Sequence, residues 1–398
     1  MKVAIVHEWL ENYAGSERVL AQILRCFPQA DIFAVVDFLP DAERGFLEGR
    51  AVRTSYIQKL PFARRHFRNY LHLMPTAIEQ FDLTGYDLVI SSNHAVAKGV
   101  LTGPKQVHVS YVHSPMRYAW DLQSQYLRES GLERGPKSLY VRWLLHKMRL
   151  WDANSANGVD QFIANSSYIA RRIRKTYRRE SLVVPPPVAV DEFTPGQGKR
   201  EGFLVVSRFV PYKRVELIAQ AFREMPEHQL TIVGAGTNAP LVAKAVKRAP
   251  NIILRPPVPH DELVELMRTT RAMIFAAEED FGITMVEAQA CGTPVIAFGE
   301  GGARDIFSAS GKKLPTGILF DEQTVPSIIA AVRRFVLQEP CITASLCRAN
   351  ALRFSEDAFR ERFMAAVANA LEVSRPSAGM YHAISSADAE KEYASVGE

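Results

Sequence analysis

Two carboxylates that flank a glycine loop are the residues most able to do chemistry in this chain. Glu279 precedes Gly282, and Glu287 follows it in a segment with apolar residues at helical spacing. Apolar runs at residues 272–275 and 294–297 predict buried strands on either side. A helix N-terminus offers free N–H groups to an anion, and carboxylates accept hydrogen bonds from hydroxyl pairs. The pattern suits a nucleotide sugar, although a solvated acidic pair would give the same spacing.

Two cations follow another predicted strand at residues 203–206. Arg208 and Lys213 flank a turn that leads into a predicted helix at residues 215–222. An arginine can bind a phosphate with a bidentate fork, and a lysine acts as a point charge. This pair would neutralise a diphosphate well, and two exposed surface charges are the alternative interpretation.

A histidine and three glycines complete the candidates that the residues alone suggest. His113 follows a predicted strand at residues 107–111, and the end of a strand is where α/β proteins bind ligands. An isolated histidine is also often structural. Gly15 lies in the loop after the first predicted strand, at residues 2–7. Gly234 and Gly236 resemble a dinucleotide fingerprint, but no acidic residue ends the next strand, which argues against NAD and leaves a nucleotide-contacting loop.

These candidates follow strands that alternate with helices, which predicts an α/β fold of two Rossmann-like domains. The chain has 398 residues, a length typical of two domains rather than one. We predict an N-terminal domain at residues 1–187, which ends at a stiff triple proline, and a C-terminal domain at 188–353. Residues 374–398 are rich in small and acidic residues and predict a disordered tail.

Composition is typical of a soluble globular enzyme. Apolar residues make up 47% of the chain, and no apolar stretch reaches the ~20 residues of a membrane-spanning helix. The first apolar run is interrupted too early for a signal peptide. The four cysteines show no metal-ligand spacing and predict reduced packing residues in the cytoplasm.

Positive charge is concentrated in the first half of the chain. Residues 1–187 contain 25 Lys and Arg against 17 Asp and Glu, with clusters at 59–68, 137–149 and 171–179. Two of these clusters carry interleaved bulky apolar residues, which is typical of a segment that lies on an anionic membrane. Ordinary charged helix faces are the alternative. No nucleic-acid-binding signature accompanies the charge, so we expect no nucleic-acid partner.

Three sequence blocks resemble the retaining GT-B glycosyltransferases of family 4, also called group 1. Their order is a His-Ser-Pro-Met-Arg-Tyr-Ala-Trp-Asp run at 113–121, the Arg-x4-Lys-Arg run at 208–214, and the Glu-x7-Glu run at 279–287. The first block is similar to bacterial O-antigen and exopolysaccharide mannosyltransferases of the WbaZ type. The resemblance covers roughly residues 1–373 and implies a central cleft between the domains. It also implies a C-terminal helix, at 355–373, that crosses back to the N-terminal domain.

The resemblance also assigns roles to the candidate residues. It places His113 near the anomeric carbon, Glu279 on the transferred sugar, Glu287 on the ribose, and Arg208 and Lys213 on the diphosphate. The remaining assignments are loop contacts to the donor by Phe281, Gly282, Ile283 and Thr284, donor-side contacts by Gly15, Gly234 and Gly236, and acceptor-side or structural roles for Arg117 and Asp121. Family members often have Gly-Gly where this chain has Ala14-Gly15, so only the second glycine matches.

The implied activity is retaining transfer of mannose from GDP-mannose to a polyprenol-diphosphate-linked glycan in bacterial surface polysaccharide synthesis. The chain contains no Asp-x-Asp motif, so neither a metal nor another cofactor is expected. The expected location is the cytoplasm, with peripheral contact to the inner face of the plasma membrane. The alternatives are a UDP-sugar-dependent transferase or epimerase of the same fold, and a non-catalytic nucleotide-sugar-binding scaffold.

Overall fold

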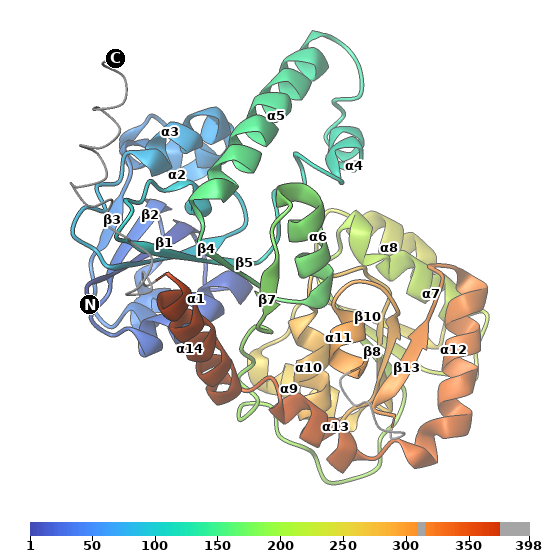
Figure 1. Ribbon diagram of the computed structural model, residues 1–398. Helices are drawn as coiled ribbons and strands as arrows, with labels where there is room; N and C mark the ends of the chain where they lie inside the picture. Colours follow the sequence, from blue (N-terminus) through green and yellow to red (C-terminus); the bar gives the residue numbers. More distant parts are fainter. Residues whose placement is uncertain (309–314, 375–398) are drawn as a thin grey trace, which may run out of the picture.

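The computed structural model describes residues 1–308 and 315–374, which form two α/β domains side by side (Figure 1). Most of the predicted tail, residues 375–398, lies outside the described residues. Neither domain has an antiparallel strand pair within its main sheet in the described part of the chain. Parallel sheets need helical crossovers that cover both faces, which explains the near-continuous apolar runs along these strands.

The N-terminal sheet has seven strands in the order β3-β2-β1-β4-β5-β6-β7. They are β1 (Val3–Leu10), β2 (Asp31–Asp37), β3 (Val52–Thr54), β4 (Leu88–Asn93), β5 (Val107–Val112), β6 (Gln161–Ala164) and β7 (Ser181–Val183). The C-terminal sheet has six, in the order β10-β9-β8-β11-β12-β13. They are β8 (Phe203–Val206), β9 (Leu230–Val233), β10 (Ile252–Arg255), β11 (Ala272–Phe275), β12 (Val295–Phe298) and β13 (Gly317–Phe320).

Helices connect these strands. In the N-terminal half they are α1 (Gly15–Cys26), α2 (Ala63–His66), α3 (Met74–Glu79), α4 (Gln123–Glu129), α5 (Pro136–Ser155) and α6 (Ser167–Tyr177). In the C-terminal half they are α7 (Val215–Arg223), α8 (Ala239–Val246), α9 (His260–Thr269), α10 (Ile283–Ala290), α11 (Ala303–Ser308), α12 (Val325–Gln338), α13 (Ala344–Leu352) and α14 (Glu356–Val373). Short 3-10 turns include η4 (Ala97–Gly99) and η6 (Pro211–Lys213). No helix in the described part of the chain is long and apolar enough to cross a membrane.

The first strand is longer than the sequence predicts. We expected it to end at His7, but β1 continues to Leu10, and Trp9 and Leu10 still pair with β2. The polar residue that suggested a loop is Glu8, which is fully buried. Its carboxylate accepts hydrogen bonds from the backbone N–H groups of residues 94–97, so the charge is solvated by the protein and the strand can continue.

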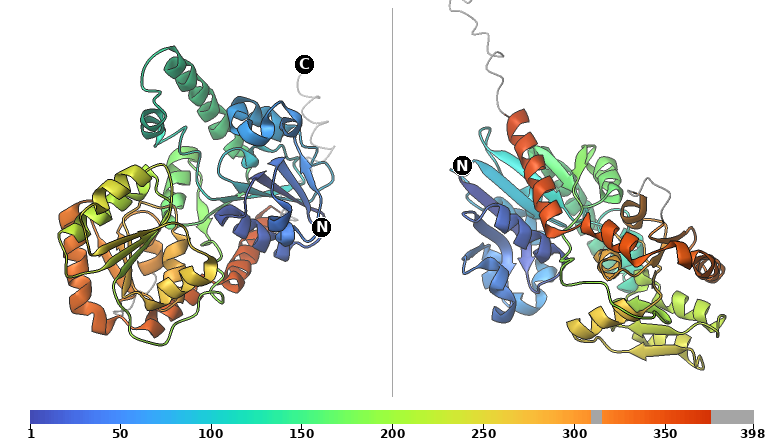
Figure 2. Two further views of the ribbon diagram at one scale, coloured as in Figure 1. Left: turned by 180° about the vertical axis from the view of Figure 1, so that it is seen from behind. Right: turned by 90° about the horizontal axis from the view of Figure 1, so that it is seen from below.

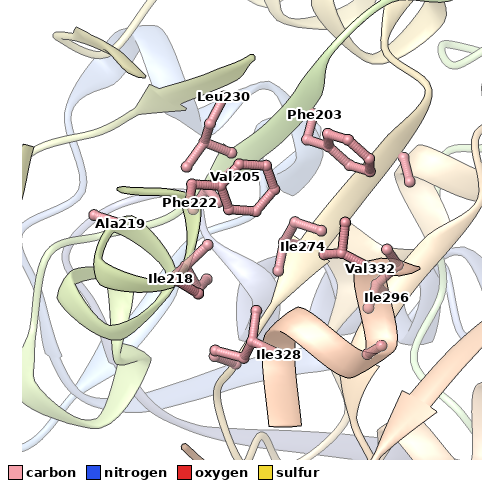
Figure 3. Packing of buried hydrophobic residues seen from close by; sticks show 14 of the residues in the cluster. Phe203, Val205, Ile218, Ala219, Phe222, Leu230, Ile274, Ile296, Ile328 and Val332 are labelled. Carbon is pink, nitrogen blue, oxygen red and sulfur yellow. The ribbon is translucent and has the colours of Figure 1, made fainter. Parts of the chain in front are cut away.

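The C-terminal domain has a core between its sheet and its outer helices. Figure 3 shows part of this core, in which Phe203 of β8 and Phe222 of α7 lie with Ile274 of β11 and Ile328 of α12. The rings of Phe203 and Phe222 meet edge to face, with centroids 5.3 Å apart. The opposite face of the same sheet packs against α10, whose Met285 and Val286 are fully buried. This packing fixes the loop that precedes α10.

The last helix belongs to the other domain. Helix α14 packs on the N-terminal sheet, where Phe359 and Phe363 contact Tyr111 of β5 (Figures 1 and 2). A backbone hydrogen bond of 2.9 Å from Val188 to Phe354 joins the chain's two passages between the domains. The predicted fold, with two Rossmann-like domains and a C-terminal helix that returns to the first, is confirmed.

Helices α4 and α5 form an arm. In Figure 1, α5 extends away from the N-terminal sheet, and α4 lies near its outer end. The base of α5 is held by a buried ion pair of 2.8 Å between Lys98 and Asp152. Asp152 also accepts a hydrogen bond of 2.7 Å from Trp120, so the arm is fixed to the segment that follows β5.

Candidate active site

The carboxyl ends of strands from both domains meet at one cavity. Its volume is about 550 Å³, and residues of the N-terminal domain line one wall while residues of the C-terminal domain line the other. The lining includes six groups of predicted site residues: Gly15, His113, Arg117, Arg208, Lys213 and the loop from Glu279 to Thr284. Segments that are far apart in the sequence therefore meet where parallel α/β sheets bind ligands.

Ionised groups dominate the C-terminal wall. Lys213 and Glu279 form an ion pair, and both side chains are largely buried. Arg208 lies beside them with no carboxylate partner among the described residues, and its closest polar contact is the Tyr212 hydroxyl at 3.4 Å. Lys213 ends the turn η6, and α7 begins two residues later, whereas Arg208 lies in the loop between β8 and η6. Arg208 is thus available to bind an anion, whereas the Lys213 ammonium is already paired with the Glu279 carboxylate.

The loop before α10 requires glycine. Gly282 has a φ of 100°, and a Cβ at this position would lie 2.1 Å from Cε of Met285. Helix α10 starts at the next residue, so Ile283 and Thr284 line the cavity from the first turn of a helix, where backbone N–H groups are free to bind an anion. Phe281 is buried, and its ring packs against Phe354 with centroids 5.4 Å apart. Its side chain therefore anchors the loop, and only its backbone is free for a ligand.

Glu287 has a different environment from Glu279. It is nearly buried on α10 and does not line the cavity; its carboxylate contacts the Arg18 guanidinium of α1 at 2.8 Å. Burial raises the pKa of Glu287, and the Arg18 charge opposes this effect. The two carboxylates of the Glu-x7-Glu run are thus separated: one faces the cavity and one bridges the domains.

The N-terminal wall carries His113. Its Nε2 lies 2.9 Å from the Ser92 hydroxyl, and its carbonyl accepts a hydrogen bond of 2.9 Å from Asn165. Burial lowers the pKa of His113 to about 3, and the neighbouring rings of His94 and His7 act in the same direction. At neutral pH the imidazole on this wall is uncharged.

Three polar residues that sequence reasoning missed support this wall. His94 lines the cavity and packs against His113, with ring centroids 6.4 Å apart. Glu17 receives hydrogen bonds from the Ala14 N–H at 3.0 Å and from His7 at 3.3 Å. Burial would raise the pKa of Glu17, but the contacts with His7 outweigh it and lower the pKa to about 2. Glu17 could have been found from the sequence, because a glutamate at the third position of a helix is typical of a capping box.

Arg117 and Asp121 lie at the boundary between the domains. Arg117 forms an ion pair with Asp280, and Asp121 forms one with Arg172 of α6. Arg172 also donates to the Ser114 hydroxyl at 2.9 Å and lies 3.5 Å from Asp280. Sequence reasoning missed Arg172, which belongs to no recognisable motif, and Asp280, which lies inside the Glu-x7-Glu run beside Glu279. These four charges connect the segment after β5 with the loop after β11.

The glycines after β9 have a structural explanation. A Cβ on Gly234 would lie 1.9 Å from the Ser207 carbonyl oxygen, and one on Gly236 would lie 2.4 Å from that of Phe209. Their backbone therefore packs against the loop that carries Arg208. Gly234 also lines a neighbouring cavity of about 530 Å³ with Arg208 and Lys213, whereas Gly236 lines neither cavity. In the described residues, no group of three or more His, Cys, Asp or Glu side chains is placed to hold a metal ion.

The fold and the site together define a GT-B architecture, with two parallel-sheet domains and a cleft lined from both sides. Two family models match adjoining parts of the chain: Glycosyltransferase Family 4 at residues 13–192 and Glycosyl transferases group 1 at residues 191–353. Together they span both domains, and the chain belongs to the group 1 glycosyltransferases of family 4. The family prediction made from the three sequence blocks is confirmed at this level.

Curated relatives match part of the chain. The D-inositol 3-phosphate glycosyltransferase of Geodermatophilus obscurus is 31% identical over 244 residues, which cover 54% of this chain and 53% of the relative. The enzyme of the same name from Acidothermus cellulolyticus is 29% identical over 261 residues, or 57% of each chain. The chain thus spans about half the length of the curated relatives that it matches. These relatives do not carry the name of the WbaZ-type mannosyltransferases.

Solved structures share the fold over nearly the whole chain. Sucrose-phosphate synthase from Thermosynechococcus elongatus has a TM-score of 0.69 at 15% identity and covers 94% of this chain and 100% of its own. Anabaena Alr3699/HepE in complex with UDP has a TM-score of 0.66 at 16% identity, with 93% and 100% covered. At this identity the likeness concerns the fold.

Proposed function

We propose that this protein transfers a sugar from a nucleoside diphosphate sugar to a hydroxyl acceptor, with retention of the anomeric configuration. One observation carries the proposal: Arg208, Lys213, Glu279 and the amide-bearing loop at Gly282 converge on a cavity that His113 closes from the other domain. A cation pair and a helix N-terminus suit a diphosphate, and a carboxylate beside them suits sugar hydroxyls. Water would be excluded when the two walls approach each other around the substrates.

The charges on each wall fit such a reaction. As the bond between the anomeric carbon and the diphosphate breaks, negative charge grows on the diphosphate, and Arg208 and Lys213 stabilise it. Glu279 releases Lys213 to the phosphate and accepts hydrogen bonds from the sugar. Positive charge grows at the anomeric carbon, where the uncharged imidazole of His113 does not oppose it. The acceptor hydroxyl attacks from the face that the leaving phosphate departs from, and that phosphate takes the acceptor proton.

The proposed donor is GDP-mannose, and the proposed acceptor is a polyprenol-diphosphate-linked glycan of bacterial surface polysaccharide synthesis. Both proposals rest on the similarity of residues 113–121 to the WbaZ-type enzymes. A second candidate is a UDP-sugar donor with an inositol phosphate acceptor. The names of the curated relatives and the UDP bound to HepE favour this candidate. We further propose that turnover requires no metal ion, so activity should persist in excess chelator; loss of activity that Mn²⁺ restores would contradict this.

We also propose that the enzyme works in the cytoplasm and touches the inner face of the plasma membrane through the arm. Leu139, Tyr140 and Trp143 of α5 are more than half exposed, and Arg142 and Lys147 lie among them. Aromatic side chains between basic ones favour an anionic interface. Co-sedimentation with phosphatidylglycerol vesicles, but not with phosphatidylcholine vesicles, is the expected result. Equal recovery with both vesicle types would contradict the membrane contact.

The first experiment is a melting-temperature series with GDP, UDP, ADP and NAD. Stabilisation by GDP alone supports the mannosyltransferase proposal, and stabilisation by UDP alone supports the second candidate, because a ligand stabilises the state that binds it. Absence of a shift with every nucleotide contradicts both. The companion variant is Glu279→Ala, which should abolish transfer and keep the cooperative unfolding of the parent. Normal turnover by that variant would overturn the assignment of the site.

A further inference from the structure

A second cavity, of about 680 Å³, adjoins the active-site cavity. It lies between α4, the start of α6 and the loops that follow β8 and β11. The two cavities share five lining residues, namely Arg117, Tyr126, Arg208, Tyr212 and Asp280. The two cavities are therefore continuous, and a molecule bound in the second cavity can reach into the active-site cavity.

The lining of this second cavity is rich in groups that bind hydroxyls and ring faces. Tyr126, Tyr168 and Tyr212 come from α4, α6 and the turn η6, so three elements each contribute an aromatic ring. Gln125 and Gln323 add side-chain amides from the two domains. A tyrosine combines an apolar face with a polar hydroxyl, and an amide both donates and accepts hydrogen bonds. Pyranose rings offer the matching surface, with C–H faces and equatorial hydroxyls.

The charges of this cavity are balanced. Four arginines and four carboxylates line it. Arg117 is paired with Asp280 and Arg172 with Asp121, so two of the four cations already have a carboxylate partner. Of the other two arginines, Arg208 also lines the active-site cavity, where we propose that it binds the donor diphosphate. A second phosphate would then have Arg214 as its cation, and the carboxylates of Glu129 and Glu278 would repel it. An uncharged polyhydroxy ligand meets no such repulsion.

We infer that the second cavity binds an uncharged saccharide, the part of the acceptor that lies next to the hydroxyl receiving the new sugar. The inference rests on the proposed function, since an acceptor presupposes a transferase. It gives the acceptor a chemical class, a neutral glycan. It places recognition in the side chains of α4 and α6, while the donor is held by the C-terminal wall.

The test is saturation-transfer difference NMR on the full chain. The probes are mannotriose, maltotriose, chitotriose and myo-inositol 1-phosphate, each measured with saturating GDP or UDP to occupy the donor cavity. Two variants, Gln125→Ala and Tyr168→Ala, alter residues that line only the second cavity. The matched control is Tyr140→Ala, an exposed tyrosine of the arm that lines neither cavity.

We expect at least one neutral trisaccharide to bind in the presence of nucleotide, and we expect each variant to weaken that binding roughly three- to tenfold. Tyr140→Ala should bind as the parent does. The inference is overturned if no trisaccharide binds, if both variants bind it unchanged, or if only inositol phosphate binds and the variants weaken it. Melting shifts with nucleotide, recorded on the same samples, report the proposed function separately: if they persist without saccharide binding, only this inference fails.

Discussion

The two walls of the active-site cavity differ in their electrostatics. The C-terminal wall places Arg208, Lys213 and Glu279 around a helix N-terminus, and Lys213 forms an ion pair with Glu279. The N-terminal wall places the rings of His94 and His113 against each other, and burial lowers the pKa of both. We call the C-terminal side the charged wall and the N-terminal side the neutral wall, because both imidazoles are uncharged at neutral pH and Arg117, which also lines the N-terminal side, is paired with Asp280.

The difference assigns one half of the reaction to each domain. A departing diphosphate carries negative charge and gains from the cations of the C-terminal wall. A carbon that becomes electron-poor is better placed beside an uncharged ring than beside an imidazolium. Contacts between the walls bring these halves together: Arg18 reaches Glu287, and Ser167 donates through its N–H to Asp305 at 2.6 Å. Domain position and site chemistry are therefore linked.

Removal of the free cation of the charged wall should have the largest effect. Arg208→Ala leaves no buried carboxylate unpaired, because Arg208 has no carboxylate partner among the described residues. We expect kcat to fall roughly 10²- to 10³-fold, the range for loss of one charge-stabilising group. Lys244→Ala, an exposed lysine of α8, is the control and should keep kcat. A decrease in kcat of less than tenfold for Arg208→Ala would contradict binding of the diphosphate at this wall.

The neutral wall is tested by His113→Asn and by pH. We expect a roughly tenfold to 10²-fold lower kcat, with no acid limb near pH 6.5 in the parent enzyme, because burial lowers the pKa of His113 to about 3. His146→Asn, an exposed histidine of α5, serves as the control. A limb near pH 6.5 that disappears in His113→Asn would show that the ring titrates normally and that the wall is not neutral.

The same substitution has a consequence for stability. The unfolded chain protonates His113 near its ordinary pKa of 6.5, and the folded protein does so only near 3. The unfolded state therefore binds more protons at acid pH. This contribution to stability is complete above pH 6.5 and decreases as the pH falls toward 3. Denaturant unfolding at pH 7 and pH 5 should show a larger loss for the parent than for His113→Asn; equal losses would contradict the lowered pKa.

The contact between the walls should have an intermediate effect. Arg18→Ala leaves the Glu287 carboxylate without its paired cation, so the effect of burial, which raises the Glu287 pKa, meets less opposition. We expect nucleotide affinity to fall roughly tenfold, because the carboxylate for which the sequence resemblance predicts a ribose contact becomes protonated or moves. Arg25→Ala is a matched control on the same helix, since Arg25 pairs with Glu356 at 2.8 Å away from the cavity. Titration calorimetry with the stabilising nucleotide distinguishes the two variants.

The comparison of the walls also explains what the sequence could and could not predict. The charged wall consists of residues that follow strands within short motifs, so local spacing predicted Arg208, Lys213, Glu279 and Gly282. The neutral wall depends on partners from distant segments. His94 was missed because the buried Glu8 that holds its loop is 86 residues away.

The partners of the predicted residues were missed for the same reason. Arg18 and Glu287 are separated by 269 residues, and no local pattern pairs them. Asp280 was passed over because it adjoins Glu279, which already had a role. The parallel sheets could be predicted, because apolar runs and glycine loops are typical of them. The end of β1 could not be predicted, because a buried carboxylate looks like a loop residue until its hydrogen-bond donors are known.

Substitution of the two small residues at the start of α1, the N-cap Ala14 and Gly15, should have the smallest effects and tests how closely a ligand approaches the neutral wall. Ala14 has a φ of −128° and needs no glycine; because glycine loses more chain entropy but is favoured over alanine at an N-cap, Ala14→Gly should change stability by less than about 1 kcal/mol and leave transfer within roughly threefold. A Cβ on Gly15 would lie 3.5 Å from Cδ1 of Ile283, an ordinary contact, so Gly15→Ala should fold as the parent does. If Gly15→Ala loses transfer activity and Ala14→Gly does not, the substrate therefore lies within contact distance of the Gly15 backbone. Unchanged transfer in both variants would place the sugar and the diphosphate entirely on the charged wall, and the neutral wall would then act through His113 alone.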